Sequence, residues 1–305
     1  SILIMKYDTA EDKYNKFRRL IKKHFSLKSS SPTTRESIMA FELWGGLTSE
    51  EMKKRIRELK EYDIRFDDVW LDAGWYGQCT KCDEAFSGDW FMYTGDWNAN
   101  RRIHPNGLEA IAECAEDAGM NMMLWIEPER AVDTTPIMKE HPEWFMKRPE
   151  DNYGLLNYGN EEALDYAINV VSSYVEKLNM SCYRQDFNIP TTEIFKYNDE
   201  ENRRGVSEIK HITGLYKFWD ALIKRHPNLL IDNCSGGGRR IDIESLKRSI
   251  PFFRSDYQCN FNENPDVLQV HTANSLAYLP YVGCTSKTKE DTYASRSSFA
   301  SSWGG

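Results

Sequence analysis

The sequence lacks the features of several common classes of protein. Its 305 residues carry 39 Lys and Arg against 47 Asp and Glu, a net charge of −8, and the basic residues form no stripe. Because nucleic-acid-binding proteins present clustered positive charge, no nucleic acid is expected as a partner. No apolar run approaches the ~20 residues of a transmembrane helix, so no membrane partner is expected either.

Cysteine and histidine are too few and too scattered for a disulfide scaffold or a metal centre. The seven cysteines are odd in number and irregularly spaced, and Cys79 and Cys82 form a lone CxxC pair. A local disulfide or two free thiols fit that pair better than zinc, because no second pair has ligand spacing. His104, His141 and His226 each precede proline, which predicts surface turns. We therefore predict no metal and no cofactor.

The N-terminal segment differs from the rest of the chain. It lacks the charged start and long apolar stretch of a signal peptide, which favours the bacterial cytoplasm over secretion. Residues 11–25 are helix-prone, and residues 29–34 form a Ser/Pro/Thr linker. We expect a helical lead-in and linker over residues 1–36 and a catalytic barrel over residues 37–305.

Beyond the linker, apolar runs of strand length alternate with helical periodicity. This alternation predicts an α/β protein with a (β/α)8 (TIM) barrel, a fold of typically about 250 residues. The alternative is an open doubly wound sheet, but no GxGxxG motif follows Gly45–Gly46 after the first strand. The expected strands are 38–44, 68–71, 120–126, 180–183, 229–231, 250–253, 276–282 and, with the weakest pattern, 298–303; the expected helices are 50–62, 108–118, 161–178, 206–225 and 241–247.

Polar and aromatic clusters follow the expected strands, on the face where barrels carry their active sites. An isolated aspartate after a strand is more often a cap or a turn residue, but clusters that recur in strand order favour a site. Asp186 and Asp256 each end an apolar run. Two such carboxylates suit a double displacement on a sugar, in which one attacks and the other moves a proton. The clusters are residues 44–48 (WGGLT), 71–77 (LDAGWYG), 124–129 (LWIEPE), 183–188 (YRQDFN), 232–239 (DNCSGGGR) and 254–256 (RSD).

Through these motifs, in this order, the sequence resembles glycoside hydrolase family 36, the retaining α-galactosidases and α-N-acetylgalactosaminidases. The resemblance runs from residue 44 to about residue 304. It implies that Asp186 is the nucleophile, Asp256 the general acid/base, Asp72 a ligand of sugar hydroxyls and Trp125 a wall of the sugar pocket. The other residues expected to bind substrate are Trp44, Trp75, Arg184, Asn188, Cys234, Gly237 and Arg239.

The sequence also departs from the family pattern. Ala73 stands where a second aspartate is usual, and Arg184 where lysine is usual, which is not a neutral exchange. The family's flanking β-domains are not seen. The expected substrate is an oligosaccharide or glycoconjugate with a terminal α-linked galactose-type sugar. Two alternative functions stay open: an α-N-acetylgalactosaminidase or galactosaminidase specificity, and an inactive carbohydrate-binding barrel. The formation of a homo-oligomer also stays open.

Glu127 and Glu129 form a second pair of carboxylates near the expected site. Pro128 between them favours an extended segment, and we expect their side chains to point to opposite sides. We therefore expect them to support the site or the barrel rather than to act on the substrate.

Overall fold

A computed structural model describes residues 3–27, 37–84, 87–253, 255–259, 264–280, 283–285, 292–298 and 302–304. Contacts divide the chain into two compact units. The main unit comprises residues 40–229, and the second unit comprises residues 1–39 and 230–305. The predicted boundary at residue 36 lies outside the described residues and stays a prediction.

Four adjacent parallel strands form the centre of the main unit. They run in the order β7, β3, β2, β1, and in register Ala40 faces Asp68 while Leu124 faces Tyr183. Every residue of β2 is buried, as expected for a parallel sheet covered on both faces. The strands are β1 (Met39–Leu43), β2 (Asp68–Leu71), β3 (Asn121–Ile126) and β7 (Met180–Gln185).

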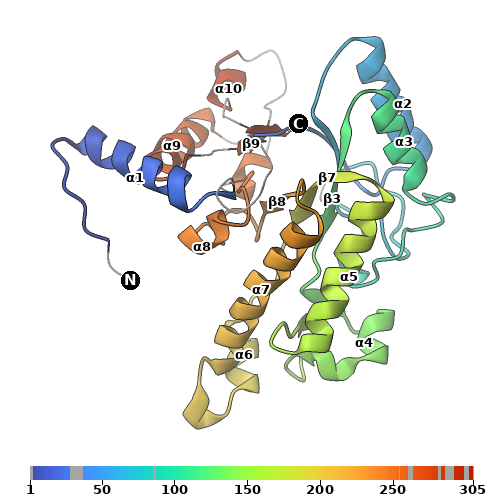
Figure 1. The fold of residues 1–305 in the computed structure, drawn as a ribbon. Coiled ribbons are helices and arrows are strands. Elements are labelled where there is room, and N and C mark those ends of the chain that lie inside the picture. The colour runs from blue at the N-terminus through green and yellow to red at the C-terminus, as the bar shows by residue number, and fades with distance from the viewer. Residues whose placement is uncertain are drawn as a thin grey trace. The chain divides into compact units, whose positions relative to one another are not determined.

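Amphipathic helices connect these strands. Thr48 and Glu51 form a capping box at the start of α2, and the Asn160 side chain caps α5. α2 packs beside α3, and α5 lies beside both α7 and β7 (Figure 1). The helices are α2 (Ser49–Glu61), α3 (Glu109–Asp117), α5 (Glu161–Lys177) and α7 (Val206–Arg225). The strand–helix alternation confirms the predicted α/β class.

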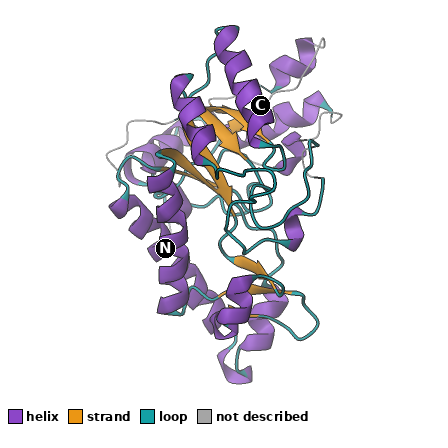
Figure 2. Cartoon of the chain, turned by 90° about the vertical axis from the view of Figure 1, so that its right-hand side faces the viewer, coloured by secondary structure: helices purple, strands orange, loops and turns teal. Residues whose placement is uncertain are grey.

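A small antiparallel sheet is inserted between β3 and α5, and the sequence patterns did not indicate it. β6 lies between β4 and β5, and Figure 2 shows this sheet among helices, apart from the parallel strands. Its strands are too short to show a period of two residues. The elements between β3 and α5 are β4 (Arg130–Val132), α4 (Pro136–Glu140), η3 (Pro142–Trp144), β5 (Phe145–Met146) and β6 (Tyr153–Leu156). Elsewhere, η2 (Trp90–Met92) lies between β2 and α3, and α6 (Thr192–Asn198) and η4 (Glu201–Arg203) lie between β7 and α7.

The second unit contains the remaining strands and helices. β9 and β10 pair in parallel, and Asp232 at the end of β8 accepts a hydrogen bond from the Phe252 N–H at 2.7 Å. In the described part of the chain, no helix is long and apolar enough to cross a membrane. The elements are α1 (Ala10–His24), β8 (Leu230–Asn233), α8 (Ile243–Leu246), η5 (Asp256–Cys259), α9 (Pro265–Leu276), β9 (Gly283–Thr285), α10 (Thr292–Ser297) and β10 (Ser302–Gly304).

The predicted strands of the second unit are only partly correct. The prediction for 276–282 is wrong over 276–280, because α9 extends to Leu276 and a turn follows; residues 281–282 lie outside the described residues. The predicted strand at 250–253 contributes a single bridge, between Ile250 and Asp232. β10 covers only the end of 298–303, and residues 299–301 lie outside the described residues. Among the described residues, the ladders within each unit do not close a ring.

Candidate active site

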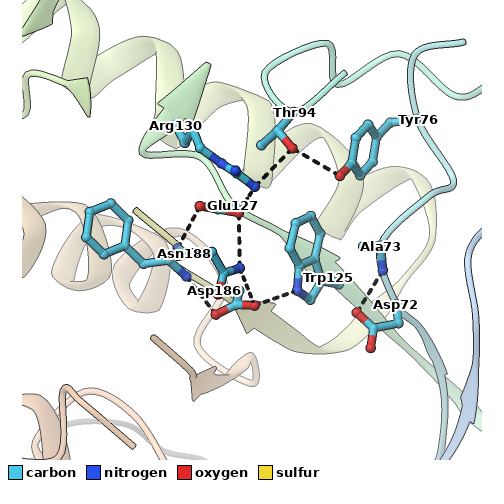
Figure 3. Close-up of polar contacts among 10 residues, drawn as sticks. Asp72, Ala73, Tyr76, Thr94, Trp125, Glu127, Arg130, Asp186 and Asn188 are labelled. Atoms are coloured by element: carbon cyan, nitrogen blue, oxygen red, sulfur yellow. Dashed lines mark hydrogen bonds and ion pairs between the residues drawn. The ribbon is translucent and has the colours of Figure 1, made fainter. Parts of the chain in front are cut away.

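Asp186 comes directly after β7, and three donors hold its half-buried carboxylate (Figure 3). Oδ1 accepts the Phe187 backbone N–H at 2.7 Å. Oδ2 accepts Nε1–H of Trp125 at 3.2 Å and Nδ2–H of Asn188 at 2.7 Å. Hydrogen bonds from N–H groups fix the orientation of a carboxylate. The arrangement suits a nucleophile that must be correctly directed.

Aromatic rings surround Trp125. The ring of Tyr76 stacks on it at 5.9 Å with 9° between the planes, and Trp90 meets it edge-on at 5.7 Å. Trp75 donates from Nε1 to the Trp125 carbonyl at 2.9 Å and is fully buried. Trp75 therefore supports Trp125 and has no exposed ring surface for a ligand to contact. Trp44 is 5% exposed and packs edge-on against Trp90 at 6.2 Å.

Asp72 lies after β2 in a buried cluster with Glu42 and Arg184. Its Oδ1 accepts the Ala73 N–H at 2.7 Å. Burial raises the pKa of Asp72 well above its usual range, the Glu42 carboxylate raises it further, and the Arg184 guanidinium opposes both effects. Arg184 is 3% exposed, and its guanidinium lies 4.8 Å from the ring of Trp70. The structure thus brings together Asp72 and Arg184, two of the residues expected to bind substrate.

Glu42 belongs to this cluster, although the sequence patterns did not single it out. Burial raises its pKa, while a side-chain hydrogen bond with Asp72 and the charge of Arg184 lower it. Among the described residues, Glu42 Oε1 is buried without a hydrogen-bond partner. A polar atom in that position is suited to a ligand hydroxyl. The available signal was a charged residue within the otherwise apolar strand β1.

Glu127 follows β3 and is fully buried (Figure 3). Its Oε2 forms an ion pair with Nη2 of Arg130 at 2.7 Å, and its Oε1 accepts the Asn188 backbone N–H at 2.8 Å. Nδ2 of Asn188 also donates to Oε2, at 3.2 Å. Burial raises the pKa of Glu127 to about 7, with Arg130 opposing that effect and the Asp186 charge adding to it.

Glu129 contacts a different set of residues from Glu127, as expected, but the predicted extended segment is wrong. Residues two apart in an extended segment share one face. Pro128 and Glu129 instead form a turn, in which the Arg130 N–H donates to the Glu127 carbonyl oxygen at 3.4 Å, and this turn separates the two carboxylates. Its Oε1 accepts Nε2–H of Gln185 at 2.9 Å, and its Oε2 lies 2.8 Å from Nε2 of His211. Nε1 of Trp219 donates to Oε1 of Gln185. This network ties the end of β7 to α7, so Glu129 supports the scaffold.

The loop after β1 packs closely against the loop after β2. A Cβ on Gly45 would lie 2.3 Å from the Asp72 carbonyl oxygen, so only glycine fits there. His104 is buried against this loop, with Nδ1 2.9 Å from Ser49 Oγ and Nε2 3.3 Å from the Gly45 carbonyl oxygen. Burial lowers its pKa to about 4. The predicted surface position of His104 is therefore wrong, because a His-Pro turn does not determine which way the ring points.

The two cysteines of the CxxC pair are not bonded to each other. Cys79 and Cys82 are free thiols, and Cys79 is buried. Burial raises the pKa of the Cys79 thiol to about 12, so it is held protonated and unreactive.

The predicted residues of the second unit also lie close to one another. Asp256 opens η5 and is exposed. Gly237 has φ +84°, and a Cβ there would lie 2.8 Å from the Asp256 nitrogen. Its own N–H donates to Sγ of Cys234 at 3.3 Å. Arg239 is exposed, with its guanidinium against Gly236. The glycine loop thus passes directly beside the predicted acid/base.

The predicted site residues therefore form one group in each unit. The main unit contains Trp44, Asp72, Trp75, Trp125, Arg184, Asp186 and Asn188, and the second unit contains Cys234, Gly237, Arg239 and Asp256.

Known proteins resemble this chain in sequence and in structure. A family model described as Melibiase matches residues 3–280. The α-galactosidase AgaA of Geobacillus stearothermophilus is 32% identical over 180 residues, which is 57% of this chain and 24% of that protein. Mel36A of Lactobacillus acidophilus, also an α-galactosidase, is 27% identical over 217 residues, 68% of this chain and 28% of that protein. The chain thus spans about a quarter of the length of these relatives.

Solved α-galactosidase structures have the same fold. The enzyme from Lactobacillus brevis superposes with a TM-score of 0.81 at 19% identity, covering 98% of this chain and 41% of that one. An AgaA variant in complex with stachyose gives 0.80 at 21% identity, covering 97% and 42%. These likenesses confirm the predicted barrel-type α/β fold. Because the Melibiase model spans residues 3–280, this chain belongs to the melibiase family, the α-galactosidase family GH36.

Proposed function

We propose that the chain carries the catalytic machinery of a retaining, exo-acting glycoside hydrolase that removes terminal α-galactosyl-type residues from oligosaccharides. The observation that carries this proposal is the Asp186 carboxylate, held by three N–H donors beside the Trp125 ring. The relatives support it, because they are α-galactosidases and one AgaA structure is a complex with raffinose.

In the first step, Asp186 attacks the anomeric carbon. The bond to the leaving oxygen breaks as Asp256 donates its proton, so the aglycone departs as an alcohol and a glycosyl ester forms on Asp186. In the second step, Asp256 takes a proton from water, which attacks the same carbon and releases Asp186. Two inversions give a product with the configuration of the substrate.

The buried carboxyl cluster is proposed to recognise the sugar. Asp72, together with Glu42, would accept hydrogen bonds from sugar hydroxyls, and Arg184 would balance their charge. The Trp125 ring would pack against an apolar C–H face of the sugar. Ala73 removes one expected contact, which we propose relaxes recognition at O4 or O6 of the galactose ring.

A panel of aryl α-glycosides tests the reaction and the sugar together. The panel varies C2 among hydroxyl, amine and acetamide, and C6 between hydroxymethyl and methyl. We expect hydrolysis of an α-galactosyl-type member with retained configuration. If the wild-type protein binds sugar but cleaves no member of the panel, it is a carbohydrate-binding barrel. If it cleaves only the acetamido or amino sugar, the α-N-acetylgalactosaminidase or galactosaminidase alternative is established.

Azide distinguishes the roles of the two aspartates. In Asp186→Gly, azide should replace the missing nucleophile and form the β-glycosyl azide by a single inversion. In Asp256→Ala, azide should intercept the glycosyl ester and form the α-glycosyl azide. Azide products of the opposite configurations would contradict the assignment.

A further inference from the structure

We propose that Glu127 is a positioning residue for the nucleophile and acts through Asn188. This inference rests on the proposed role of Asp186. It gives a function to the buried Glu127–Arg130 ion pair, which the double displacement does not use.

Asn188 bridges the two carboxylates. Its Nδ2 donates to Oδ2 of Asp186 at 2.7 Å and to Oε2 of Glu127 at 3.2 Å. Its backbone N–H donates to Oε1 of Glu127 at 2.8 Å. Glu127 therefore holds both the main chain and the side chain of Asn188. With both amide hydrogens engaged, the Asn188 side chain presents a donor to Asp186 rather than its carbonyl oxygen.

Glu127 is itself anchored from the opposite side. Nη2 of Arg130 contacts Oε2 of Glu127 at 2.7 Å and donates to Oγ1 of Thr94 at 3.2 Å. Thr94 Oγ1 in turn lies 3.4 Å from the Tyr76 hydroxyl, completing the path drawn in Figure 3. A buried carboxylate with this many fixed donors has one available position, which suits a residue that orients another. The charged and titratable groups facing Glu127 are Arg130, Asp186 and Tyr76.

Burial excludes a direct role for Glu127 on the substrate. Its side chain has no exposed surface, and both oxygens already accept hydrogen bonds. The ionised form can accept all of these bonds, whereas protonation would convert one acceptor into a donor. The path to the reacting atoms therefore runs through Asn188 to Oδ2 of Asp186.

A purely structural role makes a different prediction. If Glu127 only clamps the segment after β3 to the loop after β7, its loss should slow every reaction at the site equally. A positioning role should slow only the reaction in which Asp186 attacks. Replacing the nucleophile by free azide separates these cases, because azide needs no orientation by Asn188.

The experiment compares Glu127→Gln in the wild type and in Asp186→Gly with azide, using one aryl α-galactoside. With Asp186 present, we expect kcat to fall by roughly 10- to 100-fold and KM to change much less, since small misplacements of a reacting group cost about this much. With azide in Asp186→Gly, we expect the substitution to change the rate by less than about twofold. The matched control is Glu129→Gln, which removes a buried carboxylate two residues away that is bonded to Gln185 and His211. This variant should not show the dependence on the nucleophile.

Three results would overturn the proposal. Provided that the wild type is active, two results of Glu127→Gln would show that Glu127 does not act through Asp186. One is that the azide reaction slows as much as the reaction with Asp186, and the other is that KM rises while kcat stays unchanged. No turnover by the wild type would refute the proposed function, and the positioning role with it. If Glu127→Gln does not fold, Glu127→Asp, which keeps the charge but withdraws the carboxylate from Asn188, gives the same test and must lose kcat only when Asp186 is present.

Discussion

The raised pKa of Glu127 predicts how the stability of the fold depends on pH. Burial raises this pKa from its ordinary value of 4.5 to about 7 in the folded chain. Between these values the folded protein keeps a proton that the unfolded chain has lost. The contribution of Glu127 to stability is therefore fully present below pH 4.5 and is lost as the pH rises through about 7. Glu127→Gln removes this dependence.

The magnitude follows from the size of the shift. The difference between about 7 and 4.5 is about 2.5 pH units, and each unit corresponds to ~1.36 kcal/mol. Relative to Glu127→Gln, the wild type should lose about 3 kcal/mol of unfolding free energy between about pH 4.5 and about pH 8. Solvent does not screen this effect, because the Glu127 side chain is fully buried.

Denaturant unfolding of both proteins across this pH range measures the difference. A ¹³C NMR titration of the side-chain carboxyl resonance that disappears in Glu127→Gln gives the pKa independently. Glu143→Gln is a control of opposite sign, because hydrogen bonds at this exposed carboxylate lower its pKa. The reasoning would be refuted if the difference in unfolding free energy between the wild type and Glu127→Gln did not change with pH. It would also be refuted if the wild type became more stable relative to the variant as the pH rises.

The remaining predictions concern the rest of the site. Gly45→Ala should destabilise the protein by about 3 kcal/mol, measured by unfolding, because its Cβ would overlap backbone oxygens of Asp72 and Ala73; wild-type stability would contradict the packing. Trp125→Phe should lower kcat by roughly 10- to 100-fold, since it removes a hydrogen bond to a charged carboxylate; an unchanged kcat would count against that bond. Glu42→Gln should lower the pKa of Asp72, because the Glu42 charge raises it, and should move any ionisation seen in KM to lower pH; a move to higher pH would contradict the coupling.

Local patterns were sufficient for most helices and for the central strands. The expected helix at 206–225 and strand at 68–71 match α7 and β2, because a long amphipathic period and a short buried run are local properties. The prediction at 276–280 failed because a short apolar stretch does not by itself determine whether it is buried; here it forms the end of α9 and a turn that exposes Leu276 and Tyr278. The insert with β4, β5 and β6 could not be found, since its pairing depends on contacts distant in sequence.

The sequence alone determined which residue types follow each strand, and so which carboxylates could carry the chemistry. Tertiary structure decided how each one is used. Glu127 and Glu129 are two positions apart, yet one reaches Asp186 through Asn188 and the other braces α7. Glu42 and Asp72 become a coupled pair only when β1 lies beside β2. The physical reason is that burial and the neighbouring charges, which the packed structure sets, control the protonation and orientation of a carboxyl group.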